Sequence, residues 1–224
     1  MPLILILAEC GIELIPKKLR NHPAIRKNLN SRNYASQLLD NALHHTAMKK
    51  LKNYQKRGRP DVAHLCLLNA LGSPLNKAGL LKVYLHTTRN KIYFFNPEIR
   101  ITRNFNRFKG LMAKLLIDNI IGPENSPLIS SFRGSLKDLI DSFEEPEVIL
   151  FSSRENLVKN AETLFSKGSE KNYVILIGGF QKSRLSERVR GLSERKISIS
   201  NYSLDAWVAV YKALCAFENA NDIV

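Results

Sequence analysis

The sequence predicts an α/β protein built around a parallel sheet with helices on its faces. From residue 147 onward, apolar runs of strand length alternate with amphipathic runs of helix length, which is typical of parallel sheets. The chain has 224 residues, 44% of them hydrophobic, enough to bury a large core. We therefore expect a single domain spanning residues 1–224.

The N-terminal quarter predicts one strand and two helices. Residues 3–8 are apolar but too short to span a bilayer, and no basic residue precedes them, so a buried first strand is expected rather than a membrane segment. A polar, basic region follows at 16–33. Residues 34–54 then show helical spacing, with lysines near the C-terminal end, where the helix dipole favours cations. A shorter helix over 61–71 has Asp61 as its expected cap.

The middle of the chain predicts a hairpin and a basic helix. Strands are expected at 80–86 and 91–95, and their close spacing suggests a hairpin inserted beside the main sheet. Thr102 is the expected cap of the next helix. The buried stripe of that helix is expected to contain Phe105, Phe108, Leu111, Met112, Leu115 and Leu116.

The C-terminal part predicts three strands that end at one edge of the sheet. Strands are expected at 148–151, 173–177 and 196–200, with helices at 152–165, capped by Ser152 or Ser153, and at 204–217. Ligands bind at the carboxyl ends of the strands in such sheets. Those ends place Ser152, Gly178 with Gly179, and Ser200 with Asn201 around one crevice.

Positive charge is concentrated in one segment. Residues 41–117 contain fifteen lysines and arginines but only two acids, Asp61 and Glu98, a net +13 of the formal +14. A solvated basic face is the simpler interpretation, but clustered cations favour a nucleic acid, because each phosphate contact releases condensed counterions. Arg103 and Arg107 share one helix face near Arg100, so the three can converge on one site.

Several function classes lose support. The sequence has no GxGxxG or GxxxxGK[ST] motif and no GxSxG elbow, which argues against ordinary dinucleotide binding, nucleotide hydrolysis and a local serine nucleophile. Its three cysteines have no CxxC pairing and its five histidines no HExxH spacing. We expect no disulfide framework and no metal, in a reducing compartment.

Five short motifs occur in order along the chain. They are Arg57-Gly58-Arg59-Pro60-Asp61 with His64, Ser73-Pro74-Leu75-Asn76-Lys77, Asn96-Pro97-Glu98-Ile99-Arg100 with Arg103 and Arg107, Ile177-Gly178-Gly179-Phe180, and Ile197-Ser198-Ile199-Ser200 before Leu204. Together these motifs resemble the nucleolar essential protein family of SPOUT methyltransferases. The resemblance is weakest over 16–33 and 122–145. Two departures are Gln181-Lys182-Ser183, where the family often has a further glycine, and Gly72, where an aspartate is frequent.

The resemblance implies an enzyme that uses S-adenosylmethionine to methylate the N1 atom of a pseudouridine in small-subunit ribosomal RNA, with a role in ribosome biogenesis. It also implies a homodimer and a C-terminal trefoil knot over about 147–218. Ribosomal proteins are further candidate partners. The location would be cytoplasmic in an archaeon and nucleolar in a eukaryote.

The resemblance also assigns residues. The RNA-binding residues would lie in a basic insertion over about 55–110 and comprise Arg59, Asp61, Arg100, Arg103 and Arg107. The cofactor-binding residues would be Ser152, Gly178, Gly179, Ser183, Ser198, Ile199, Ser200, Asn201, Tyr202 and Leu204.

Two alternatives stay open at this point. Asp61 could accept the N1 proton as a general base, or it could orient an arginine through a salt bridge, which is favoured because an acid among cations stays ionised. The competing function is a non-enzymatic factor that binds ribosomal RNA during small-subunit assembly, which would need no cofactor crevice.

Overall fold

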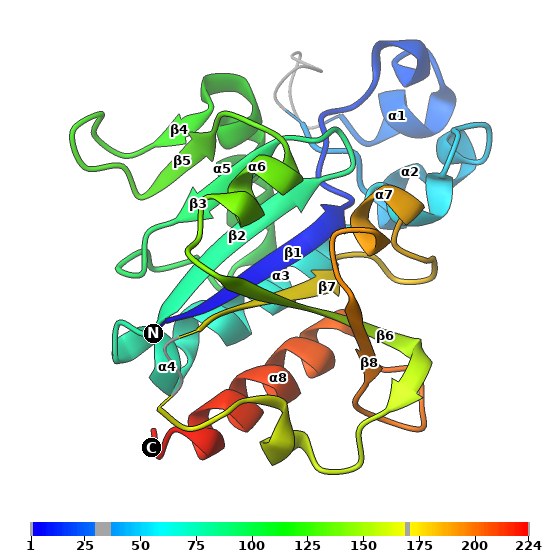
Figure 1. Cartoon of the computed structure of the whole chain (residues 1–224). Coiled ribbons are helices and arrows are strands. Elements are labelled where there is room, and N and C mark those ends of the chain that lie inside the picture. The colour runs from blue at the N-terminus through cyan, green and yellow to red at the C-terminus, as the bar shows by residue number, and fades with distance from the viewer. Residues whose placement is uncertain (1, 30–36, 169–170, 224) are drawn as a thin grey trace.

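One mixed sheet forms the centre of the protein. In this computed structural model, which describes residues 2–29, 37–168 and 171–223, eight strands follow the order β4-β5-β3-β2-β1-β7-β6-β8 (Figure 1). Four pairings, β2 with β1, β1 with β7, β7 with β6 and β6 with β8, are parallel, and the other three are antiparallel. The strands are β1 (Leu3–Cys10), β2 (Leu81–Thr87), β3 (Ile92–Phe95), β4 (Ile120–Ile121), β5 (Ile129–Phe132), β6 (Pro146–Leu157), β7 (Asn172–Gly178) and β8 (Arg195–Ser198).

Helices cover both faces of this sheet. The core on one face draws on α3, α5 and α8, and the core on the other face draws on α6 and α7. The α-helices are α1 (Pro23–Lys27), α2 (Asn41–Met48), α3 (Pro60–Gly72), α4 (Pro74–Lys77), α5 (Phe105–Asp118), α6 (Leu136–Asp141), α7 (Glu187–Arg190) and α8 (Ala206–Ala220). Short 3₁₀ turns are η1 (Lys17–Leu19), η3 (Tyr54–Lys56) and η4 (Ala161–Leu164).

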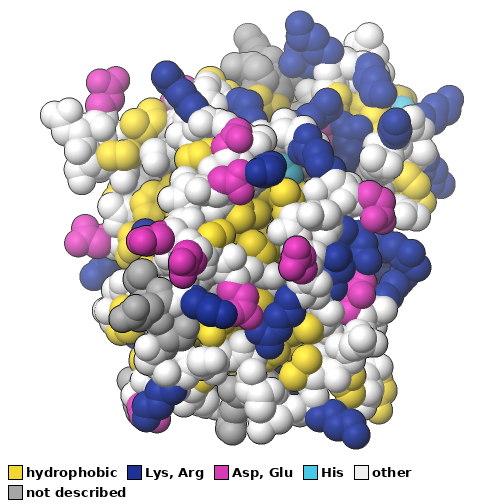
Figure 2. Space-filling view, viewed as in Figure 1, with side chains coloured by type: hydrophobic (Ala, Val, Ile, Leu, Met, Phe, Trp, Pro, Cys, Tyr) yellow, Lys and Arg dark blue, Asp and Glu magenta, His cyan; other side chains and the backbone are white. Residues whose placement is uncertain are grey.

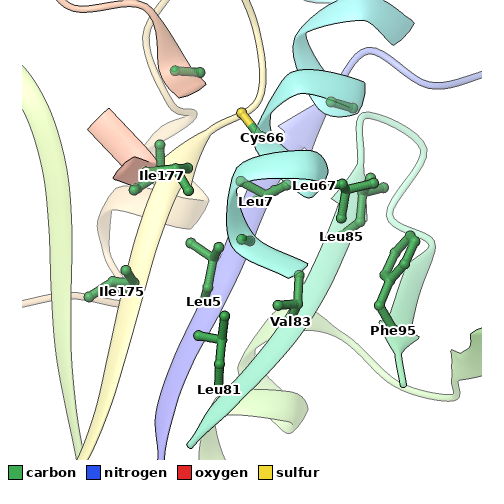
Figure 3. Close-up of a cluster of buried hydrophobic side chains, with 14 of the residues drawn as sticks. Leu5, Leu7, Cys66, Leu67, Leu81, Val83, Leu85, Phe95, Ile175 and Ile177 are labelled. Carbon is green, nitrogen blue, oxygen red and sulfur yellow. The ribbon is translucent and has the colours of Figure 1, made fainter. Parts of the chain in front are cut away.

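Strand β1 divides its side chains between the two cores. Leu3, Leu5 and Leu7 join the larger core, whereas Ile4 and Ile6 join the smaller one on the opposite face. Successive side chains of a strand point to opposite faces, so a strand buried on both sides is apolar throughout. Figure 3 shows Leu5 and Leu7 with Leu67 of α3 and Val83 of β2 on the larger side. This pattern confirms the buried first strand that the sequence predicts.

A third, smaller core lies outside the sheet. It belongs to the segment between β1 and α3, where α1 and α2 pack together, and consists of Ile15, Leu19, Ile25, Leu39, Ala47, Met48 and Leu51. We call the described residues 15–29 and 37–56 the basic lobe. It follows the carboxyl end of β1 and ends just before Arg57, which leads into α3.

The predicted helix over 152–165 is wrong. Strand β6 continues to Leu157, and only the short turn η4 is helical in that range. The backbone N–H of Val158 donates to the carbonyl of Ser198 at 2.8 Å, and Asn156 and Leu157 pair with β8. Pairing with β8 therefore supplies the backbone hydrogen bonds that a helix would have made, and tertiary context overrides local spacing.

The hairpin and several helix ends also differ from expectation. The antiparallel pairing of β2 with β3 is present, but β2 also pairs in parallel with β1, so the hairpin belongs to the central sheet rather than beside it. Helix α2 is shorter than predicted, and residues 34–36 of that prediction lie outside the described residues. Asn104, not Thr102, caps α5, and Arg59 occupies the cap position of α3, with Asp61 in its first turn.

Candidate functional site

A pocket opens where β6, β7 and β8 approach their carboxyl ends. Its lining comes from four chain segments: residues 150–154, 177–185 with Arg190, 198–204, and the first turns of α8. Of the residues assigned to the cofactor from sequence, eight line it: Ser152, Gly178, Ser183, Ser198, Ile199, Ser200, Tyr202 and Leu204. The structure therefore brings together segments separated by about fifty positions in the sequence.

A break in β6 creates one wall of this pocket. The register between β6 and β8 shifts between Phe151 and Asn156, so residues 152–155 leave the ladder. An irregularity of this kind bends a strand and re-aims its side chains. Arg190 of α7 forms an ion pair at 2.9 Å with Glu155, one of the residues that leave the ladder. The break thus exposes Ser152 and Ser153 to the pocket instead of pairing them.

Local hydrogen bonds shape the loop after β8. The hydroxyl of Ser198 donates to the carbonyl of Ser200 at 2.8 Å, and the N–H of Tyr202 donates to the hydroxyl of Ser200 at 3.0 Å. Short polar side chains commonly stabilise turns in this way. Asn201, assigned to the cofactor from sequence, is exposed and does not line the pocket.

The two adjacent glycines have different surroundings. Gly178 lines the pocket, and a Cβ there would lie 2.7 Å from the ring of Phe180. Gly179 is buried behind it, and a Cβ would lie 2.1 Å from the sulfur of Cys10. The backbone N–H of Gly179 also donates to the carbonyl of Ala8 at 2.8 Å. Gly179 is therefore a packing residue of the sheet and does not line the pocket.

Arg59 and Asp61 form a bidentate pair beside the pocket. The guanidinium donates from Nε to Oδ1 at 2.8 Å and from Nη2 to Oδ2 at 2.6 Å, the fork geometry that charged pairs favour. Its third nitrogen, Nη1, donates to the side chain of Gln181, which lines the pocket. The hydrogen bonds that Arg59 donates to Asp61 raise the pKa of Arg59 despite partial burial. One arginine thus connects the acid-poor segment to the pocket.

The other three arginines predicted to bind RNA have exposed side chains and lie close together in the chain. Arg100, Arg103 and Arg107 are all exposed, Arg100 and Arg103 in the loop before α5 and Arg107 in its first turn. Buried His64 of α3 holds this loop: its Nε2 donates to the carbonyl of Thr102 at 2.7 Å, and its ring stacks on Phe108 at 4.3 Å. The helix that carries Asp61 therefore also positions these arginines.

Lys56 connects the basic lobe to the same rim. Its Nζ lies 2.6 Å from Glu9 and 5.1 Å from the ring centre of Phe180, a pocket residue. Burial raises the pKa of Glu9, but hydrogen bonds from Lys56 and Ser186 outweigh it and bring the pKa below its ordinary value. Glu9 is therefore an ionised anchor that joins the lobe, β1 and the loop before α7.

Some pocket residues were missed by sequence reasoning. Phe180, Gln181, Arg154, Arg190, Ala206 and Ala209 all line the cavity. The two alanines lie three positions apart on one face of α8, and this small-residue spacing was a usable signal. Arg154 and Arg190 had none, because their segments approach each other only in the tertiary structure.

Across 2–29, 37–168 and 171–223, no helix combines the length and apolarity needed to cross a membrane. Over the same ranges, no cluster of three or more His, Cys, Asp or Glu side chains could hold a metal ion.

Known proteins match this chain over nearly its whole length. A family model described as EMG1/NEP1 methyltransferase matches residues 5–218. Proteins named ribosomal RNA small subunit methyltransferase Nep1 are similar, that of Staphylothermus marinus at 40% identity over 100% of this chain and 98% of its own, and that of Thermococcus onnurineus at 36% over 96% and 97%.

A solved structure shares the fold. The crystal structure of Archaeoglobus fulgidus Nep1 bound to S-adenosylhomocysteine matches with a TM-score of 0.86 and 34% identity, covering 98% of this chain and 99% of the other. The family resemblance found in the sequence motifs is thus confirmed by a full-length match in both sequence and structure. The chain belongs to the EMG1/NEP1 methyltransferase family.

Proposed function

We propose that this protein transfers a methyl group from S-adenosylmethionine to the N1 atom of a pseudouridine in small-subunit ribosomal RNA. The observation that carries the proposal is the connection between the pocket and the basic segment, made by Arg59 through Gln181. A cofactor site and an RNA site must adjoin for such a transfer. The curated relatives are named as small-subunit ribosomal RNA methyltransferases, which supports the same substrate class.

The pocket lining fits the chemistry of the cofactor. Apolar walls from Leu150, Phe151, Ile199 and Leu204 suit a flat purine, and several serine hydroxyls suit the ribose and the amino acid end. S-adenosylmethionine carries no phosphate, so the absence of phosphate-binding motifs is compatible with it. The structurally similar Archaeoglobus protein is bound to the demethylated product, S-adenosylhomocysteine.

The protein's own task is then mainly positioning. When bound, S-adenosylmethionine would supply a methyl group already activated by its sulfonium: the S–CH3 bond would break as the N1–CH3 bond forms, the sulfur would keep the electron pair, and the N1 proton would pass to water. Oriented reactants reach effective molarities of ~10⁵ M or more, so holding the base at the pocket can supply much of the rate. The exposed arginines would bind phosphates of the RNA, and a base in folded RNA must first leave its stack.

For Asp61 the geometry supports the orienting role. Both carboxylate oxygens accept hydrogen bonds from Arg59, so Asp61 holds that guanidinium toward Gln181 and the pocket. Asp61→Asn should therefore weaken RNA binding while leaving turnover at saturating RNA within about threefold, because general-base loss typically costs about 10²–10⁴-fold. A hundredfold loss of saturated turnover with unchanged RNA affinity would assign the base role instead.

Calorimetric titration with S-adenosylmethionine and S-adenosylhomocysteine tests the pocket. Gly178→Val should abolish binding, because the added carbons displace Phe180 from the lining. Gly72→Val is the matched control, since Gly72 is exposed and a Cβ there meets nothing within 4 Å. No binding by the folded wild-type protein would favour the assembly-factor function.

The base specificity needs a separate assay. An RNA carrying pseudouridine at the target position should be methylated, and the same RNA with uridine should not, because the N1 atom of uridine is bonded to its ribose. Methylation of both RNAs would exclude N1 as the acceptor. Methylation of neither, with cofactor binding intact, would point to a different RNA site.

The homodimer and the trefoil knot belong to the same proposal. Tyr202 and Tyr211 are 78% and 60% exposed on the loop before α8 and on α8, and large exposed apolar side chains mark interaction surfaces. We expect sedimentation at twice the chain mass of 25.4 kDa. A monomer at micromolar concentration would contradict the dimer without affecting the cofactor site.

A further inference from the structure

The basic lobe carries positive charge without accessible negative charge. Its described residues include one acid, Asp40, which is 4% exposed. Both oxygens of Asp40 are occupied, Oδ1 by the N–H of Ala42 at 3.0 Å and Oδ2 by Lys109 of α5 at 2.9 Å. The only carboxylate in the described part of the lobe therefore caps α2 and ties it to α5, and it cannot neutralise the lobe's surface.

Seven cations of the lobe are exposed and form no ion pair among the described residues. They lie on η1, α1 and the turn after α2, and comprise Lys17, Lys18, Arg26, Lys27, Lys49, Lys50 and Lys52. Figure 2 shows dark-blue side chains gathered on the side of the molecule where Figure 1 places α1 and α2. Unopposed like charges repel one another, so this surface is suited to a polyanion.

The lobe is fixed relative to the pocket. Lys56 at its end contacts Glu9 and the ring of Phe180, Asn41 donates from its N–H to the carbonyl of Gly58 at 2.7 Å, and Lys109 connects α2 to α5. These contacts hold the lobe beside the pocket rim, so one polyanion can contact both Arg59 and the lobe, and the exposed carboxylate next to Arg59, that of Asp61, is paired with it.

We propose that the basic lobe is a second RNA-binding surface, which holds the phosphate backbone flanking the target nucleotide. This rests on the proposed function, since it extends the RNA path that begins at Arg59. Lysines predominate among the seven cations, and lysine binds phosphate as a point charge without reading bases. The lobe thus adds affinity and orientation to RNA binding, but no sequence selectivity.

The test uses the full-length protein and two RNAs with the same pseudouridine loop, one with a short stem and one with an extended stem. The variant Lys49→Gln/Lys50→Gln/Lys52→Gln should lower the slope of log affinity against log salt by about 2 on the long RNA, at about 0.7–0.9 per phosphate contact. On the short RNA its slope should match that of the wild type. S-adenosylhomocysteine binding and methylation of the short RNA should also be unchanged.

A matched control removes three positive charges near the amino ends of the strands, at the opposite end of the sheet from the pocket. Lys77, Lys167 and Lys171 are exposed and precede the amino ends of β2 and β7, so Lys77→Gln/Lys167→Gln/Lys171→Gln should keep the wild-type slope. Equal slopes for both triple variants on the long RNA would overturn the proposal and leave an acidic protein as the candidate partner. Failure of the proposed function would be distinguishable. It would appear as loss of cofactor binding or methylation by the wild-type protein, whereas the salt dependence of RNA affinity tests only the basic lobe.

Discussion

Gly179 illustrates how a single atom decides a residue's role. Its neighbour Gly178 faces the pocket, whereas a side chain on Gly179 would meet the sulfur of Cys10 at 2.1 Å inside the sheet. The glycine pair was recognisable in the sequence as a place of close approach. Gly179 packs against Cys10 because β1 lies beside β7, which leaves Gly178 to face the pocket. This pairing of distant strands belongs to the tertiary structure and cannot be read from the glycine pair itself.

Gly179→Ala should lower the free energy of unfolding by about 1–3 kcal/mol, the usual cost of overpacking a core. Denaturant titration measures the change. The double variant Cys10→Ala/Gly179→Ala should recover part of the loss, because it removes the sulfur that the new Cβ meets. Gly72→Ala, in open space, should leave stability unchanged or slightly raised. An equal loss in the single and double variants would show that the sulfur is not the obstacle.

Among the helices, α3 supports the segment that we propose binds RNA. His64 connects it to Thr102 and to the aromatic rings at the start of α5, while Asp61 in the same helix orients Arg59. The sequence placed His64 within the family motif but assigned it no function. Its partner lies thirty-eight positions away, so only the fold could reveal the contact.

His64→Leu should destabilise the protein by about 1–3 kcal/mol, because the carbonyl of Thr102 loses its partner. It should also flatten the salt dependence of RNA binding, since Arg103 and Arg107 flank the freed loop. Leu65→Ala changes an exposed neighbour on the same helix and should affect neither quantity strongly. A stability loss with an unchanged RNA slope would limit His64 to a structural role.

The departures in the predicted elements share one cause. The range 152–165 has helical spacing, yet β8 offers backbone partners to Asn156 and Leu157 that local spacing does not record. Likewise, the predicted hairpin could not reveal that β2 also pairs with β1, because the partners are nearly eighty positions apart. Long-range strand pairing has no local signal in a single sequence.

At the scale of the whole molecule, two buried histidines connect stability to pH. Burial lowers the pKa of His44, which lies beside Asp40 and Lys109, and it also lowers the pKa of His86, near Glu9 and Arg188. Both rings accept a backbone N–H at Nδ1, from Asp40 and Glu9 respectively, which requires that nitrogen to be unprotonated. The folded state therefore binds fewer protons than the unfolded state below the ordinary histidine pKa of 6.5.

Stability should consequently be fully present above about pH 6.5 and fall as the pH is lowered from there toward the depressed folded pKa values. Thermal unfolding between pH 7.5 and 5.5 measures this slope. His44→Gln should reduce the slope, and His45→Gln, at the adjacent exposed position, should not. An identical slope in both variants would remove His44 from the acid response.

Apolar periodicity, charge density and family motifs are properties of the linear chain, so the sequence alone predicted the α/β class, the buried first strand, the basic segment and eight of the residues that line the pocket. Three features depend on the three-dimensional fold: β2 joins the central sheet, β6 replaces a predicted helix, and Arg59 contacts Gln181. Each of these depends on contacts between residues far apart in the chain. Such contacts form only when burial and backbone hydrogen bonding are satisfied together across the whole fold.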